Sequence, residues 1–135
     1  MIYHLVCPTK YRRVIINKRV EQVIKETSIG IGLRYDIHFL EIGCDKDHVH
    51  FLVQSVPMVL PQKIVQTIKS ITAKEVFRQM PEVKKEMWGG QFWSDGYYMS
   101  TVGKHGNEQV IARYVKEQGR EGEYVRLHKD QLKLF

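Results

Sequence analysis

Two kinds of hydrophobic periodicity alternate along this chain of 135 residues, and their order narrows the choice of fold. Apolar residues recur at every second position in some segments, as in half-buried strands, and at spacings of three and four in others, as in amphipathic helices. The pattern predicts, in chain order, a strand over 2–8, a helix capped by Asn17, strands over 35–43 and 48–54, a helix over 61–79, strand-like runs over 91–93 and 97–102, and a last helix over 108–118. This is the β-α-β-β-α-β order of the ferredoxin-like (RRM-like) fold. We therefore expect an α+β fold with an antiparallel sheet, two helices on one face and the C-terminal helix near the other.

Turn-forming residues separate the expected elements. Gly30 and Gly32 are expected to break the first helix. The polar segment 44–47 predicts a turn that joins the two strands on either side of it into a hairpin. The Asp-Gly pair at 95–96 predicts a second hairpin between the strand-like runs that flank it.

The length and composition indicate one globular domain over residues 1–135. Apolar residues make up 43% and charged residues 27%, which excludes intrinsic disorder. Lysine and arginine number 21 against 15 acidic residues, and the net charge of +6 favours a polyanionic partner such as nucleic acid. With only Cys7 and Cys44, a disulfide scaffold or zinc ribbon is not expected. The sequence shows neither a signal peptide nor an apolar run long enough to span a membrane, so we expect a cytoplasmic protein.

The sequence His48-Val49-His50 lies inside an apolar strand. Side chains alternate along a strand, so the two histidines share one face, while Val49 and Phe51 share the other. We expect the apolar face to lie under the helices and the histidine pair to lie on the free face. Two imidazoles at this spacing can bind one metal ion, although a bare pair of this kind more often consists of two ordinary half-exposed histidines.

Tyr114 and Gln118 lie four residues apart in the last expected helix, so they share one of its faces. A tyrosine can act as a nucleophile, and a glutamine amide oxygen is a ligand suited to Mg²⁺ or Mn²⁺. A helical tyrosine is also often a packed aromatic with its hydroxyl at the rim. If this helix covers the free face, Tyr114 and Gln118 face His48 and His50, and the set suits phosphodiester cleavage.

Four segments together resemble one known family, the small HUH-type single-tyrosine transposases of the insertion-sequence 200/605 group. The segments are the basic run Lys10–Arg13, the histidine strand His48–Val53, the stretch Phe92–Gly103 and the sequence Tyr114–Gln118. The resemblance spans most of the chain, with the motifs in the family's order.

The resemblance implies an enzyme that cuts and rejoins single-stranded DNA at transposon ends. Tyr114 would be the nucleophile that forms a 5′-phosphotyrosine, and His48, His50 and Gln118 would bind Mg²⁺ or Mn²⁺. It also implies a homodimer that recognises DNA hairpins near the element ends. Eight basic residues are then candidates for phosphate contacts: Lys10, Arg12, Arg13, Lys63, Lys69, Lys74, Arg78 and Lys104.

Three other functions are compatible with parts of this pattern. Histidine-triad hydrolases need a third alternating histidine, and Leu52 stands at that position. A non-catalytic RRM-like nucleic-acid-binding module would need exposed aromatic residues on the central strands, where this chain has histidines. A domesticated relative that processes repeated palindromes remains open. His4, His38, His105 and His128 have no partner at ligand spacing and receive no expected role.

Overall fold

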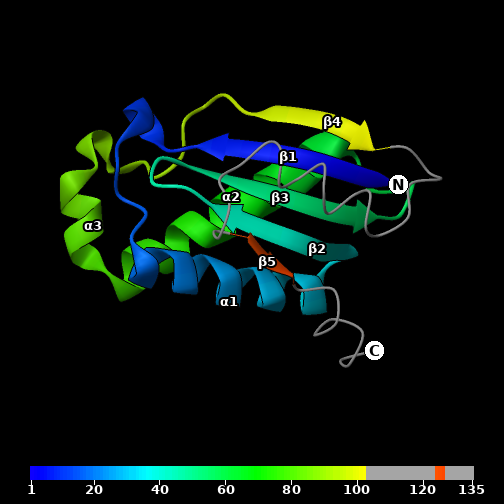
Figure 1. Ribbon diagram of the computed structural model, residues 1–135, viewed down its shortest axis with the longest axis horizontal. Coiled ribbons are helices and arrows are strands. Elements are labelled where there is room, and N and C mark those ends of the chain that lie inside the picture. The colour runs from blue at the N-terminus through cyan, green and yellow to red at the C-terminus, as the bar shows by residue number, and fades with distance from the viewer. Residues whose placement is uncertain (103–123, 127–135) are drawn as a thin grey trace.

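The computed structural model describes residues 1–102 and 124–126, and these form an antiparallel sheet with helices on one face (Figure 1). The strand order across the sheet is β4-β1-β3-β2-β5. The strands are β1 (Ile2–Pro8), β2 (Ile37–Cys44), β3 (His48–Ser55), β4 (Tyr98–Val102) and β5 (Tyr124–Arg126). The predicted α+β, ferredoxin-like arrangement is confirmed. The expected last helix, 108–118, lies outside the described residues.

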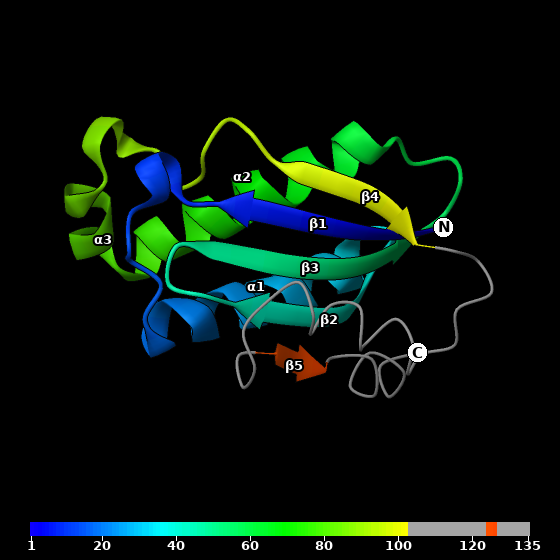
Figure 2. The ribbon, with the colours of Figure 1, turned by 45° about the horizontal axis from the view of Figure 1, so that its top comes forward.

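Two long helices lie side by side behind the sheet, as Figure 2 shows. Helix α1 (Lys18–Arg34) begins as predicted at Asn17, whose side chain accepts a hydrogen bond from the Val20 N–H at 2.9 Å. Helix α2 (Pro61–Gln79) has the predicted bounds, with its proline in the first turn, where the missing N–H costs no hydrogen bond.

The predicted break at Gly30 and Gly32 is wrong, because α1 continues through both residues to Arg34. A helical glycine costs about 1 kcal/mol relative to alanine. Burial of Ile31, which is 1% exposed between the two glycines, offsets that cost.

The main hydrophobic core lies between the sheet and the two helices. Leu5 of β1 and Phe51 of β3 are cross-strand partners with no exposed surface. They belong to one cluster with Ile24 of α1 and Ile68 of α2. Val49 and Val53 belong to the same cluster, so the apolar face of β3 lies under the helices as expected.

A second, smaller cluster lies on the opposite face of the sheet. It consists of buried Leu40 and Leu52, with Ile2 and Val102 packed against them. The face away from the helices is therefore partly apolar.

The pairing register between β2 and β3 shifts between Phe39 and Glu41, which is a β-bulge.

The predicted hairpin around residues 95–96 is wrong. Segment 91–93 forms no strand and makes only an isolated bridge between Trp93 and Thr9, while β4 pairs with β1. Phe92 and Trp93 are instead buried in the main core, and the Trp93 indole N–H donates to Thr72 Oγ1 at 2.9 Å. A short helix, α3 (Pro81–Glu86), was not anticipated either.

Candidate active site

His48 and His50 lie on the face of β3 that points away from the helices, since the alternate residues are in the main core. Their ring centroids are 4.8 Å apart and the ring planes meet at 72°. The two positions differ in exposure: His48 is half-buried, whereas His50 is 4% exposed. The pair therefore lies on the predicted face of the sheet and is set into it.

A third imidazole, that of His4, contacts His50. His4 Nε2 lies 3.1 Å from His50 Nδ1, and the rings are nearly parallel, with centroids 5.3 Å apart. His4 has no exposed surface. Local sequence patterns predict no role for His4, because its contact with His50 depends on strand register. His4 pairs with Leu52 and Val6 pairs with His50, so His4 and His50 are diagonal neighbours.

Both members of this contact favour the neutral form. Burial lowers the pKa of His4 to about 4. The pKa of His50 is also lowered to about 4, mainly by burial and to a smaller extent by the nearby His48 and His4, while Asp45 opposes the shift. A neutral imidazole has one nitrogen with a free lone pair, which is the form that binds metals.

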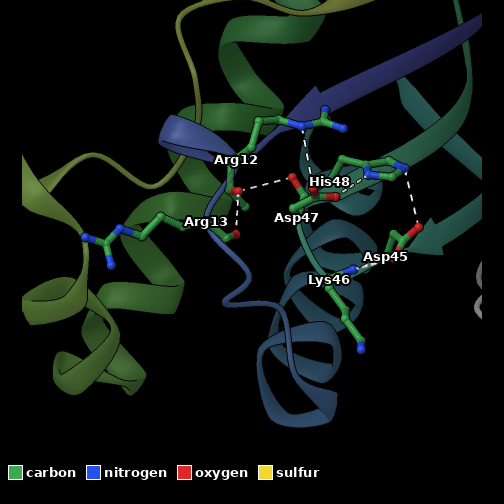
Figure 3. Close-up of polar contacts among 7 residues, drawn as sticks. Arg12, Arg13, Asp45, Lys46, Asp47 and His48 are labelled. Carbon is green, nitrogen blue, oxygen red and sulfur yellow. Dashed lines mark hydrogen bonds and ion pairs between the residues drawn. The ribbon is translucent and has the colours of Figure 1, made fainter.

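The ring of His48 is held by a hydrogen bond at Nδ1. Its Nδ1 lies 2.7 Å from Oδ1 of Asp47, and its Nε2 lies 3.8 Å from Oδ2 of Asp45 (Figure 3). The hydrogen bond from His48 lowers the pKa of the Asp47 carboxyl, so Asp47 is an ionised acceptor at neutral pH. A carboxylate cannot donate, so the proton of this bond belongs to His48 Nδ1.

The turn that carries Asp47 is fixed to the segment after β1. The Arg12 Nε lies 3.5 Å from Asp47 Oδ2 (Figure 3). Thr9 Oγ1 lies 3.1 Å from the Asp47 carbonyl oxygen and 2.7 Å from the Arg13 carbonyl oxygen. Arg12 has a φ of 53°, in the left-handed region that non-glycine residues seldom adopt. The β2–β3 turn and the residues after β1 thus form one hydrogen-bonded unit beside His48.

These residues fit a metal ion at the two histidines. A ligating histidine usually donates its other ring N–H to a fixed acceptor, and both imidazoles have a partner at Nδ1. Within residues 1–102 and 124–126, no group of three or more His, Cys, Asp or Glu side chains could hold a metal ion. The described part of the chain therefore supplies the two imidazoles, while the predicted residues Gln118, Tyr114 and Lys104 lie outside it.

Two of the predicted phosphate contacts line a groove of about 860 Å³ between α2 and residues 90–97. Lys63 is exposed there, and Lys69 Nζ donates to the Ser94 carbonyl at 2.6 Å and lies 5.7 Å from the centre of the Tyr97 ring. Tyr97 is 45% exposed. Gln62, Gln66 and Gln91 also line the groove. It therefore combines the cationic groups of two lysines, the amides of these glutamines and the aromatic ring of Tyr97.

The other predicted phosphate contacts within the described residues are spread over the surface. Lys10 lies 3.4 Å from Asp95, and Arg78 makes hydrogen bonds to Glu75. Arg13 and Lys74 are exposed. Among the helices that the structure describes, none is long and apolar enough to cross a membrane.

The chain is similar to known transposases. Residues 1–118 match the family model described as "Transposase IS200 like". The ISDra2 transposase TnpA of Deinococcus radiodurans is 28% identical over 116 residues, which cover 86% of this chain and 82% of that protein. The transposase for insertion sequence element IS200 of Salmonella typhimurium is 30% identical over 121 residues, which cover 86% of this chain and 75% of that protein.

Two solved structures share the fold. The crystal structure of a Deinococcus radiodurans protein assigned as a transposase superposes with a TM-score of 0.71 at 28% identity, over 88% of this chain and 91% of that chain. A REP-associated tyrosine transposase bound to a REP hairpin superposes with a TM-score of 0.56 at 8% identity, over 85% of this chain and 62% of that chain. The second likeness concerns the fold alone.

Proposed function

The chain belongs to the IS200-like transposase family, and from this membership we propose that it cuts and rejoins single-stranded DNA at the ends of a mobile element. The observation that carries the proposal is the pair His48 and His50, each held at Nδ1 by a neighbouring side chain. Two imidazoles fixed in this way on a central strand are a prepared ligand pair.

His48 and His50, with Gln118 as the third ligand implied by the family resemblance, would hold Mg²⁺ or Mn²⁺. When bound, such an ion polarises a phosphate oxygen and stabilises the charge that develops during phosphodiester cleavage. The contribution of the chain itself is orientation: Asp47 and His4 keep the two rings in place, so binding an ion requires little reordering of side chains.

The family resemblance makes Tyr114 the nucleophile. Its hydroxyl oxygen attacks phosphorus, the bond from phosphorus to the 3′ oxygen breaks, and the 3′ hydroxyl leaves with a proton. The phosphate remains on tyrosine as a 5′-phosphotyrosine. Attack by another 3′ hydroxyl reverses the step and rejoins the strand, and because the bond energy is retained, no nucleotide cofactor is needed.

DNA hairpins near the element ends are the proposed partner, bound by a homodimer. The structural neighbour in complex with a REP hairpin supports this choice of ligand. In this chain, the groove beside α2 offers Lys63 for a phosphate and the exposed Tyr97 ring for an unpaired base. A second candidate function, left open by the sequence, is a domesticated enzyme that acts on repeated palindromes.

The test incubates the full chain with labelled single-stranded DNA from the ends of its own locus, with and without Mg²⁺. We expect a covalent protein–DNA adduct on a denaturing gel that disappears in Tyr114→Phe but persists in Tyr3→Phe, a tyrosine control whose ring is buried in the main core. His48→Ala should lose cleavage and keep hairpin binding. An adduct that survives Tyr114→Phe would reject the nucleophile, and an adduct on internal palindromes alone would favour the domesticated enzyme.

A further inference from the structure

The buried contact between His4 and His50 contains a hydrogen bond whose direction matters for chemistry. The nitrogens are 3.1 Å apart, so one proton lies between them. If His4 donates, the proton of neutral His50 sits on Nε2, and that nitrogen has no lone pair for a ligand bond. If His50 donates from Nδ1, its Nε2 carries the free lone pair.

We propose that His4 is a positioning residue: its Nε2 accepts the Nδ1 proton of His50, fixes the tautomer and ring orientation of His50, and so keeps His50 Nε2 available to a divalent cation. The inference rests on the proposed function, because it assumes that His50 is a ligand. It assigns His4 no contact with the ion or with DNA.

The placement of the two residues supports this role. On the β2 side of His50, the residue directly opposite is Gly43, which has no side chain that could fix the ring. Support from a neighbouring strand therefore comes from β1, where His4 is fully buried and stacked at 10° to the His50 ring. A partner in a strand is more rigid than one in a loop, and small displacements of a ligand weaken metal binding.

The same arrangement recurs at His48 with a different partner. Asp47 accepts the Nδ1 proton of His48, which leaves His48 Nε2 as the lone-pair nitrogen. With His4 as the acceptor for His50, both imidazoles have the same tautomer. Half-buried His48 has a carboxylate as its partner. His50, which is 4% exposed, has a neutral imidazole instead, and this avoids burying an unpaired charge.

The first experiment uses the unmodified, metal-free protein. Long-range ¹H–¹⁵N spectra of the labelled full chain distinguish protonated from unprotonated ring nitrogens. We expect His50 to be protonated at Nδ1 and unprotonated at Nε2, and His4 to show an unprotonated Nε2. A His50 ring protonated at Nε2 would overturn the proposal without any mutation.

The second experiment titrates Mn²⁺ into full-chain variants and follows the free ion by electron paramagnetic resonance. Removing a partner of a metal-ligating histidine typically costs about 10–100-fold in affinity, and we expect that loss in His4→Phe, which keeps a ring but has no acceptor. His4→Gln places an amide oxygen near the lost Nε2 and should retain most of the affinity. Ile2→Ala, which removes bulk from the same face of β1, is the control and should bind Mn²⁺ as the parent does.

The outcomes separate this inference from the proposed function. If the parent protein binds Mn²⁺, His50→Ala abolishes binding and His4→Phe leaves it unchanged, the role of His4 is rejected while the metal site stands. If His50→Ala leaves Mn²⁺ binding unchanged, the proposed metal site fails, and the inference fails with it. If His4→Phe does not fold, two other measurements test the role of His4. The role is rejected if His4→Gln loses most of the Mn²⁺ affinity, or if His50 of the parent protein is protonated at Nε2.

Discussion

The Nδ1 atom of His48 lies 2.7 Å from Oδ1 of Asp47, the residue immediately before it in the chain. Asp47 is in turn held by Arg12 and by Thr9, both from the segment that follows β1. The orientation of His48 therefore depends on a turn and on a segment distant in sequence. Arg12, expected from the sequence to contact DNA, has a structural partner in Asp47.

Asp47→Ala should weaken Mn²⁺ binding by about 10–100-fold, because His48 loses the acceptor that fixes its ring. Asp95→Ala is a suitable control, since that carboxylate is exposed and pairs with Lys10, while neither histidine is its partner in this ion pair. The affinity is measured by Mn²⁺ titration of the full chain. Parent-like affinity in Asp47→Ala would show that Asp47 does not orient His48.

The free energy of unfolding should fall as the pH is lowered from about 6.5 toward about 4. The pKa of His4 and of His50 in the folded protein is about 4, below the ordinary value of 6.5, so the unfolded chain takes up protons first as the pH falls. The stability that comes from keeping His4 and His50 neutral is fully present above pH 6.5. It is lost as the pH falls from about 6.5 to about 4. His48 and Asp45 also influence His50.

Urea denaturation at a series of pH values measures this slope. His4→Gln removes one of the two buried imidazoles and should give a shallower decline than the parent. A parent protein with the same stability at about pH 7 and about pH 5 would contradict the low pKa values of this pair.

Thr72→Val should lower the free energy of unfolding by about 1–3 kcal/mol, because the buried Trp93 indole N–H loses its acceptor. Thr67→Val is the matched control in the same helix. Thr67 Oγ1 donates to the Lys63 carbonyl, so its removal orphans no buried indole N–H. Urea unfolding compares the two variants, and equal losses would show that the indole bond contributes nothing specific.

Lys63→Gln should weaken hairpin binding and reduce the slope of log K against log salt by about 0.7 to 0.9, as expected for one lost phosphate contact. The double variant Arg19→Gln with Glu82→Gln removes an exposed ion pair without changing the net charge and should bind as the parent does. Fluorescence anisotropy over a range of salt concentrations measures both. An unchanged slope in Lys63→Gln would exclude Lys63 from the interface.

Most helices and strands can be predicted from the sequence, because the hydrophobic periodicity and the residues that begin the helices indicate the same elements. Asn17 and Pro61 start their helices where predicted, and the alternation in His48–Ser55 placed the apolar face of β3 under the helices. The resemblance to IS200-type transposases is likewise confirmed by the family match. The roles of Tyr114 and Gln118 stay predictions, since both lie outside the described residues.

The errors arose where tertiary packing decides the local structure. Gly30 and Gly32 remain helical because Ile31, which lies between them, is buried in the main core. Phe92 and Trp93 resemble strand residues in a short apolar run, but their side chains fill the core beneath α2. The contact of His4 with His50 requires the pairing of β1 with β3, which local sequence patterns do not encode.

Strand β1 lies between β3 and β4, and both are synthesised after it. During translation the N–H and C=O groups of β1 therefore stay unpaired until strands distant in the chain have been synthesised. Pairings between distant segments form slowly, because loop closure costs entropy. The His4–His50 contact joins residues 46 positions apart, so it closes only after β3 has emerged. A nascent chain that has β3 but still lacks β4 already carries all three imidazoles, while one edge of β1 stays open to pairing with a second chain.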